Sequence, residues 1–561
     1  MRLLLVVYFI LEVLNSNSQS FTSLQGNFLN DIKPSLDLND SLKVSLSGLI
    51  KSYSQISSSI RNGSINSVLY SNLINSNLYT KRDSFSLGKK NKKLNFCISP
   101  IQALVRYNSD RPFGYNDGSM IPSRGIQLFN TFGVAVNSKF LKFEFNPELI
   151  LANNREFQGF SSNYDDYTYL QYNYFMNRID NPVRFGTTKY KRIYSGQSSL
   201  YIDYKKYRFG VSTENLWWGP SQKNSIILSN NAPGFLHATI KNHTPINFFG
   251  KVEFQVLSGL LSKSNYSNTG NQVRPRRRLF EFDRYINGLT INYQPKLIPG
   301  LYIGGSRIFI RYVSELSKSF FYGWMPVLSG VFSNNEYLNA SASVKSDQVV
   351  SLFLLQKFNH ENAEVYFEFG KNDYALNLRD FVMEPEHASA VSLGLSKKVN
   401  LNNNGQLRFL VEYTSLASPM TSLIRQQEGW YLHYQIREGY TNLGEVLGAG
   451  IGSGSISKII LIDYGLKNMR YGFQFEENQH NRDIYNYMFS YRDVSNWVDF
   501  SFLFFGSQFK KKYSLTYNIG VVKTKNYHWN DNADQNFVSP QISLTGQKPN
   551  IIFFLNYTKS F

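Results

Sequence analysis

Residues 364–369 read Glu-Val-Tyr-Phe-Glu-Phe, so that an apolar side chain falls at every second position. The same period of two recurs at 141–146, 252–256, 407–413 and 515–521. Successive side chains of a β-strand point to opposite faces, which gives each of these segments one apolar and one polar face. From about residue 94 onward, the sequence therefore predicts an all-β chain.

Alternation alone leaves two β architectures open. A soluble sandwich turns its apolar faces inward, whereas an outer-membrane barrel turns them outward against lipid. Aromatic residues make up 16% of the chain and dominate the alternating apolar positions, as expected of a lipid-facing wall with aromatic girdles. The chain also ends in an alternating segment at 551–557, followed by the terminal Phe561. These features favour a transmembrane antiparallel β-barrel.

The beginning of the sequence has the composition of an export signal. Arg2 precedes an apolar run at 3–14, and residues 16–18 read Ser-Asn-Ser, which suits a cleavage site. We therefore expect residues 1–18 to be a cleaved signal peptide. Export to the bacterial cell envelope argues against nucleic acid as a partner.

The region after the signal differs in composition from the rest of the chain. It is rich in Ser and Asn, with loosely helical spacing of apolar residues at 42–56 and 65–78. This pattern predicts an N-terminal periplasmic segment with short helices at 19–80. The barrel itself is expected at 81–561.

Charge and cysteine content narrow the range of partners. The 561 residues carry a formal net charge of +19, which favours anionic partners such as acidic polysaccharide or lipid headgroups. Cys97 is the single cysteine, so an intrachain disulfide and a Cys-based zinc site are excluded. Seven scattered histidines leave little material for metal binding, and we predict neither a metal nor a cofactor.

Two neighbouring segments carry a more specific pattern. Residues 210–220 read Gly-Val-Ser-Thr-Glu-Asn-Leu-Trp-Trp-Gly-Pro, and residues 224–233 read Asn-Ser-Ile-Ile-Leu-Ser-Asn-Asn-Ala-Pro. This pair of blocks resembles the capsule assembly Wzi family of outer-membrane proteins, over about residues 95–561. Supporting matches lie at 116–125, 368–373 and 439–452. The residues that carry the motif are Trp217, Trp218, Gly219, Pro220, Ser229, Asn230 and Asn231.

The resemblance implies an architecture and a role. It implies a barrel of 18 strands in the bacterial outer membrane, which binds or anchors capsular or extracellular polysaccharide at the cell surface without catalysis. From the basic charge we expect that polysaccharide to be acidic. We further expect a monomeric barrel in contact with outer-membrane lipid and lipopolysaccharide.

Two groups of residues are candidates for contact with such a ligand. Trp217 and Trp218 could stack on sugar rings, or they could anchor a strand end at the membrane interface or pack inside the lumen. The second group lies in a polar loop, where guanidinium groups could bind carboxylate or phosphate or could stay solvated. Its members are Arg274, Arg276, Arg277 and Arg278.

Two other functions remain open from the sequence alone. The polar strand faces could line the aqueous path of a channel or transporter. Glu384 and His387 could belong to an outer-membrane hydrolase, although neighbours in sequence rarely supply both catalytic groups, and we predict no catalytic residue. The glycines at 448–454 have the wrong spacing for a dinucleotide site and predict a flexible loop.

Overall fold

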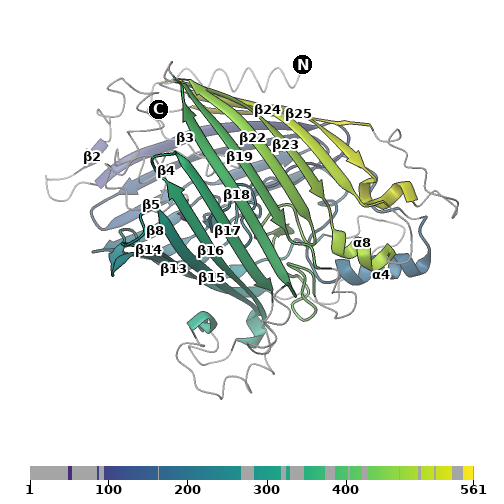
Figure 1. The fold of residues 1–561 in the computed structure, drawn as a ribbon, viewed down its shortest axis with the longest axis horizontal. Coiled ribbons are helices and arrows are strands. Elements are labelled where there is room, and N and C mark those ends of the chain that lie inside the picture. Colours follow the sequence, from purple (N-terminus) through teal and green to yellow (C-terminus); the bar gives the residue numbers. More distant parts are fainter. Residues whose placement is uncertain are drawn as a thin grey trace.

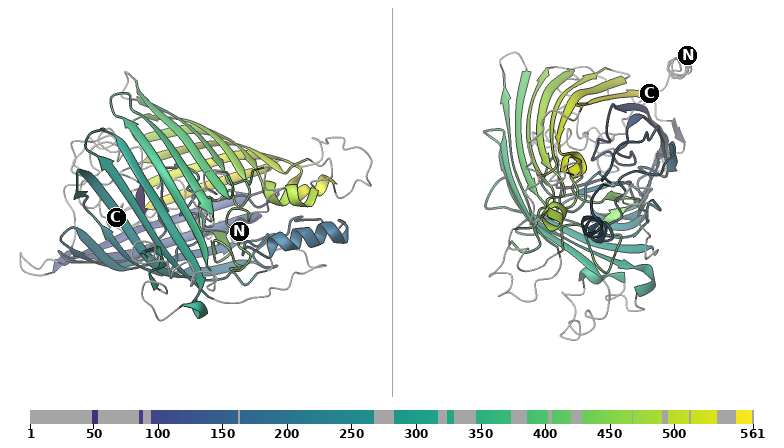
Figure 2. Two further views of the ribbon diagram at one scale, coloured as in Figure 1. Left: turned by 60° about the horizontal axis from the view of Figure 1, so that its bottom comes forward. Right: turned by 90° about the vertical axis from the view of Figure 1, so that its right-hand side faces the viewer.

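The last strand of the chain pairs with the first long one and closes the sheet. β26 runs antiparallel to β3, with Tyr557 opposite Ala103. The computed structural model describes residues 49–52, 85–87, 94–161, 163–266, 283–316, 324–328, 346–372, 386–401, 405–419, 428–466, 468–489, 495–510, 513–532 and 548–559. These residues form a closed antiparallel barrel with two helices at one end (Figures 1 and 2).

The elements are β1 (Ile50–Ser52), β2 (Phe85–Leu87), β3 (Leu94–Asn108), β4 (Gly125–Asn137), β5 (Leu141–Phe145), β6 (Glu148–Ala152), α4 (Asp166–Met176), β7 (Tyr190–Tyr194), β8 (Ser199–Tyr204), β9 (Tyr207–Ser212), β10 (Leu216–Trp218), β11 (His237–Asn242), β12 (Ile246–Asn247), β13 (Gly250–Leu261), β14 (Arg284–Pro295), β15 (Leu301–Tyr312), η1 (Val313–Glu315), β16 (Asp347–Phe358), β17 (Ala363–Asn372), β18 (Ser389–Asn400), β19 (Gly405–Ser415), β20 (Thr441–Asn442), β21 (Glu445–Val446), β22 (Ile456–Leu466), β23 (Met469–Gln479), α8 (Arg482–Phe489), β24 (Val498–Phe509), β25 (Tyr513–Lys525), η4 (Tyr527–Asn532) and β26 (Asn550–Lys559).

Eighteen strand positions make up the wall, counted over the residues that the structure describes. Four positions are each shared by two short segments. β5 and β6 both pair with β4, β7 and β8 pair with β6 and β5, β11 and β12 both pair with β13, and β2 and β26 both pair with β3. The expected all-β fold with 18 strands is thus confirmed.

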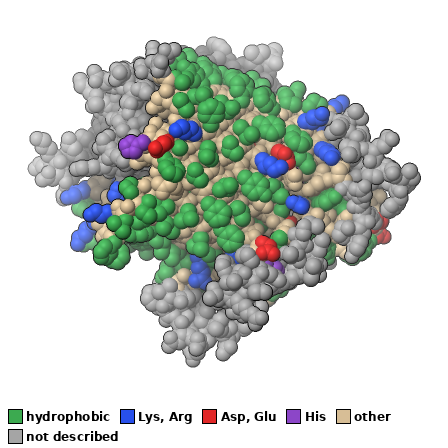
Figure 3. Space-filling model, viewed as in Figure 1, with side chains coloured by type: hydrophobic (Ala, Val, Ile, Leu, Met, Phe, Trp, Pro, Cys, Tyr) green, Lys and Arg blue, Asp and Glu red, His purple; other side chains and the backbone are tan. Residues whose placement is uncertain are grey.

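The apolar face of each strand points outward. Phe367 of β17, Val411 of β19 and Phe473 of β23 are each 40–50% exposed, whereas Glu368 and Glu412 on the alternate positions are buried. Hydrophobic side chains cover the outer wall (Figure 3). A soluble sandwich would show the reverse, so the alternation predicted from the sequence belongs to a lipid-facing barrel.

Connections differ sharply between the two ends of the barrel. Consecutive strands at one end are joined by two to five residues, at 138–140, 205–206, 248–249, 296–300, 359–362, 401–404, 467–468 and 510–512. At the opposite end they are joined by longer segments, at 109–124, 153–189, 213–236, 262–283, 313–346, 373–388, 416–455, 480–497 and 526–549. In outer-membrane barrels short turns face the periplasm and long loops face the exterior. β3 begins and β26 ends at the short-turn end.

The structure describes only some of the residues on which the N-terminal predictions were made. Ile50–Ser52, inside the helix expected at 42–56, is instead the extended strand β1. It is extended because its backbone pairs with β10, a tertiary contact that local spacing does not reveal. The signal peptide predicted at 1–18, the helix predicted at 65–78 and Phe561 lie outside the described residues. No described helix is both long and apolar enough to cross a membrane.

We expect the barrel to resist unfolding by cold SDS. The sheet closes on itself through the pairing of β26 with β3, so opening the barrel exposes a row of unsatisfied backbone groups. The purified protein should migrate differently on a gel before and after boiling, and its far-UV circular dichroism should show mainly β-structure. Equal mobility together with a helical spectrum would contradict this architecture.

Candidate functional site

The candidate site is a set of long connections that fold back into the barrel. We call the described residues of connections 109–124, 213–236 and 416–455 the lumen plug. Every residue from 214 to 233 is buried, and so are most residues from 429 to 455. Figure 2 shows these segments inside the ring of strands when the barrel is viewed from one end.

Trp217 and Trp218 lie at the centre of the plug on β10. Neither ring has any exposed surface. The indole N–H of Trp217 donates to the carbonyl of Ser221 at 3.1 Å, and that of Trp218 donates to the Gln255 side chain on β13 at 3.1 Å. In this conformation neither ring offers a face to a sugar, and we propose a packing role for the pair.

Gly219 follows the tryptophans at a position that no other residue fits well. Its φ of +108° lies in the region that disfavours residues with a side chain. An added Cβ would also come within 2.8 Å of the Glu368 carboxylate on β17. The backbone N–H of Gly219 donates to the carbonyl of Leu49 at 3.0 Å, which joins the segment before β1 to the plug.

Glu412 on β19 holds the turn after the tryptophans. Its carboxylate accepts hydrogen bonds from three successive backbone N–H groups, at 2.7 Å from Gln222, 3.1 Å from Lys223 and 2.7 Å from Asn224. The Tyr366 hydroxyl donates to the same carboxylate. Hydrogen bonds to a charged acceptor are stronger than neutral ones, so this inward-facing strand residue fixes the plug to the wall.

The Ser-Asn-Asn block joins the plug's three connections. Ser229 donates its backbone N–H to Leu447 at 2.9 Å, and the Asn231 side chain donates to Val446 at 3.0 Å. The Asn231 side chain also accepts the backbone N–H of Asn116 at 3.0 Å, while Asn230 donates to the Asn116 carbonyl at 3.2 Å. Motif segments separated by more than a hundred residues in sequence therefore meet inside the barrel.

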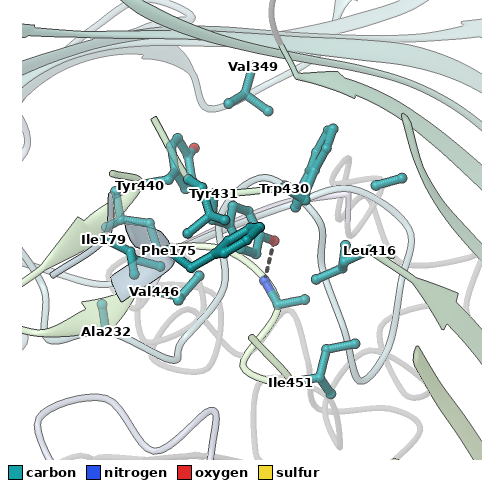
Figure 4. Close-up of a cluster of buried hydrophobic side chains, with 14 of the residues drawn as sticks. Phe175, Ile179, Ala232, Val349, Leu416, Trp430, Tyr431, Tyr440, Val446 and Ile451 are labelled. Atoms are coloured by element: carbon teal, nitrogen blue, oxygen red, sulfur yellow. Dashed lines mark hydrogen bonds between the residues drawn. The ribbon is translucent and has the colours of Figure 1, made fainter. Parts of the chain in front are cut away.

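A pair of tyrosines forms the apolar centre of the plug. The rings of Tyr431 and Tyr440 stack at 5.4 Å and 13° (Figure 4). Their hydroxyls donate to the carbonyls of Ile226 at 2.6 Å and Ile227 at 3.0 Å. Burial raises the pKa of both phenols, which keeps them protonated as donors. Neither residue was a candidate from the sequence, although Tyr440 lies within the supporting match at 439–452.

The glycine stretch at 448–454 is packed, and its prediction as a flexible loop is wrong. An added Cβ on Gly448 would collide with the Tyr431 hydroxyl and with the carbonyl of Ile226. The backbone N–H of Ala449 donates to the Tyr431 hydroxyl at 2.7 Å. The glycines allow close approach between two connections.

Most of the remaining sequence candidates fall outside the described residues. Glu384 and the loop arginines Arg274, Arg276, Arg277 and Arg278 lie outside the described residues. His387 is described, and its carbonyl accepts from Lys371 Nζ at 2.6 Å. Across the described part of the chain, no three His, Cys, Asp or Glu residues gather as a metal site would require.

Substitution of either buried tryptophan should destabilise the plug. Trp217→Ala or Trp218→Ala removes a fully buried ring and one hydrogen bond, a loss of about 3–5 kcal/mol by comparison with other buried tryptophans. The measurement is the amount of heat-modifiable protein recovered from the outer membrane. Normal recovery with loss of polysaccharide binding would favour sugar stacking instead.

Glu445 should make the stability of the plug depend on pH in the acidic to neutral range. Burial, reinforced by nearby Asp117, raises the pKa of the Glu445 carboxyl to about 8. An unfolded glutamate ionises near pH 4.5, so the folded plug holds one more proton between about pH 4.5 and 8, and its stability falls as pH rises through that window.

Hydrogen exchange of residues 428–455 measures this effect. Comparison of the wild type with Glu445→Gln at each pH cancels the intrinsic pH dependence of exchange. Protection in the wild type should fall relative to the variant between about pH 5 and 8. A constant ratio across that range would contradict the buried neutral carboxyl.

Comparison with known proteins gives a match to a family model. The model of the family described as capsule assembly protein Wzi matches residues 127–537. No curated protein matches the chain in sequence.

Among solved structures, the chain is similar to Wzi of Escherichia coli. That protein is an outer-membrane protein involved in group 1 capsule assembly and a carbohydrate-binding β-barrel. The TM-score is 0.56 at 12% identity, over 96% of this chain and 99% of that one. A weaker likeness is to OccAB2 of Acinetobacter baumannii, with a TM-score of 0.39 at 11% identity over 82% of this chain and 97% of that one.

Proposed function

Because the chain belongs to the capsule assembly protein Wzi family, we propose that it binds or anchors capsular or extracellular polysaccharide at the cell surface. The observation that carries the proposal is the family match, which spans residues 127–537 and includes both motif blocks of the plug. The likeness to a carbohydrate-binding barrel of E. coli supports it.

The filled lumen favours a binding role over transport. Eighteen strands enclose a space wide enough for an aqueous channel in porins. Here the plug occupies that space and is fixed to strand residues such as Gln255 and Glu412. A barrel filled in this way suits attachment of a surface polymer rather than passage of solutes.

The proposed role is non-enzymatic. The side chains of Ser229 and Asn231 hold the connections of the plug to one another, and Glu412 of the wall holds the turn at 222–224. Their partners are mainly backbone groups, so these side chains act as structural donors and acceptors.

The setting of the proposed function is the bacterial outer membrane, in which barrels of this family reside. We further propose that the chain is exported with residues 1–18 as a cleaved signal peptide. In the membrane it acts as a monomer whose apolar wall contacts lipid and lipopolysaccharide. Its net charge of +19 favours an acidic polysaccharide as the ligand.

Retention of polysaccharide by the purified protein tests this function. Exopolysaccharide from the cells that make the protein should be retained, and neutral dextran should not. Charge pairs at an exposed loop are screened over about 8–10 Å at physiological salt, so retention should weaken as salt rises.

A variant of the loop arginines tests whether their charge contributes to retention. Replacement of Arg274, Arg276, Arg277 and Arg278 by alanine should reduce low-salt retention, with each change costing up to about 1 kcal/mol. Barrel assembly, followed by heat-modifiability, should be unaffected. If the wild type retains no exopolysaccharide at any salt concentration, the proposed function fails. Equal retention by the wild type and this variant would contradict only the role of the arginines.

A further inference from the structure

Two helices at the long-connection end carry exposed aromatic side chains. α4 belongs to connection 153–189 and α8 to connection 480–497, and they lie side by side beyond the rim (Figures 1 and 2). Tyr167 and Tyr174 of α4 are 63% and 44% exposed, and Tyr487 of α8 is 38% exposed. We call these three residues the tyrosine platform.

The exposure of the platform does not result from poor packing of the helices. The opposite face of α4 buries Tyr169, Tyr172 and Met176, and α8 buries Ile484 and Met488, all within the main apolar cluster of the protein. Both helices therefore have a buried face that anchors them. A further set of aromatic side chains is left at the surface, and surfaces of this kind mark binding sites.

Two of the three platform rings, Tyr174 and Tyr487, are held in place by contacts with neighbouring side chains. The rings of Tyr174 and Tyr487 stack at 5.7 Å and 16°. The Arg178 guanidinium lies 4.0 Å from the centre of the Tyr174 ring and pairs with Glu428 at 3.4 Å. Burial, and then the neighbouring Tyr174 and Tyr167, raise the pKa of the Tyr487 phenol, which is consistent with one contiguous group. Side chains ordered in advance lose little entropy on binding.

The platform continues onto a third connection. Glu428 accepts the backbone N–H of Tyr434 at 3.0 Å, and Tyr434 is itself 52% exposed. The backbone N–H of His433 donates to the carbonyl of Arg178 at 3.1 Å. The surface is thus assembled from three connections at the end of the barrel that faces the exterior.

We propose that the tyrosine platform is a saccharide-binding site, on which the apolar faces of sugar rings of an acidic polysaccharide stack. This inference deepens the proposed function and rests on it. A phenol ring combines an apolar face with a hydroxyl edge, as a pyranose does, and it offers a large contact area at low entropic cost.

Charge favours a polysaccharide over a second copy of the chain. Two chains that each carry +19 repel each other, whereas an acidic polymer is attracted to the rim. Stacking on the platform and attraction to the loop arginines then contribute separately to binding.

Salt separates these two contributions. At about 1 M salt the screening length falls to about 3 Å, which removes most charge attraction but leaves ring stacking intact. The test measures retention of exopolysaccharide from the producing cells by the full-length protein at low and high salt. The variants are the triple Tyr167→Ala, Tyr174→Ala, Tyr487→Ala and the triple Tyr→Phe at the same positions.

The alanine variant should weaken the salt-resistant part of binding by at least about tenfold, because it removes all three rings on which sugars would stack. The phenylalanine variant should keep most of the salt-resistant binding, because it keeps the three rings. Phe248→Ala with Phe249→Ala is the matched control, since it removes two exposed aromatic rings from the short-turn end. All variants are first checked for heat-modifiability.

The outcomes distinguish the two proposals. If the wild type binds and the alanine variant binds equally well at high salt, the platform is not the site, while the proposed function stands. If the alanine variant keeps its binding but changes from a dimer to a monomer, the platform is a self-association surface and the inference is overturned. If the wild type does not bind at any salt concentration, the proposed function fails and this inference fails with it.

Discussion

A strand in hydrocarbon has no water to satisfy its backbone, so every N–H and C=O group of the wall must be paired with another strand. The pairing of β26 with β3 meets this requirement by removing both edges of the sheet. Closure over 18 positions has a further consequence. It encloses a lumen too wide for strand side chains alone to fill. In this chain the lumen plug fills that space.

The barrel therefore has two apolar regions separated by a polar layer. One is the outer wall, where residues such as Phe367 and Phe473 face lipid. The other is the centre of the plug, where Trp218, Tyr431 and Tyr440 are buried among aliphatic side chains. The inward strand faces lie between them. Side chains such as Gln255 and Glu412 satisfy backbone and indole donors of the plug, so the polar layer joins the two regions instead of lining open water.

The sequence predicts the wall well because alternation is local. A period of two at 364–369 already states which side chains share a face, and barrel closure then decides that this face meets lipid. The number 18 came from the family resemblance, since alternation does not count strands. Local sequence patterns do not predict the plug, because its contacts join distant parts of the chain. The Ser-Asn-Asn block, Asn116 and Val446 meet only through contacts across more than a hundred residues, and the same kind of contact makes Ile50–Ser52 a strand.

The outer rim depends on the interior of the barrel. The chain leaving α4 is bonded to the plug, where the backbone N–H of Asp180 donates to Glu438 at 2.8 Å. The first residue of α8, Arg482, donates its backbone N–H to Gly454 at 2.8 Å. Connection 416–455 thus positions both helices that carry exposed aromatic rings. Connections 153–189, 416–455 and 480–497 are thus joined to one another. A substitution deep in the lumen can therefore alter the exterior surface even though the substituted residue does not contact that surface. Assignment of a surface role to any rim residue therefore requires that the plug be shown intact in the same variant.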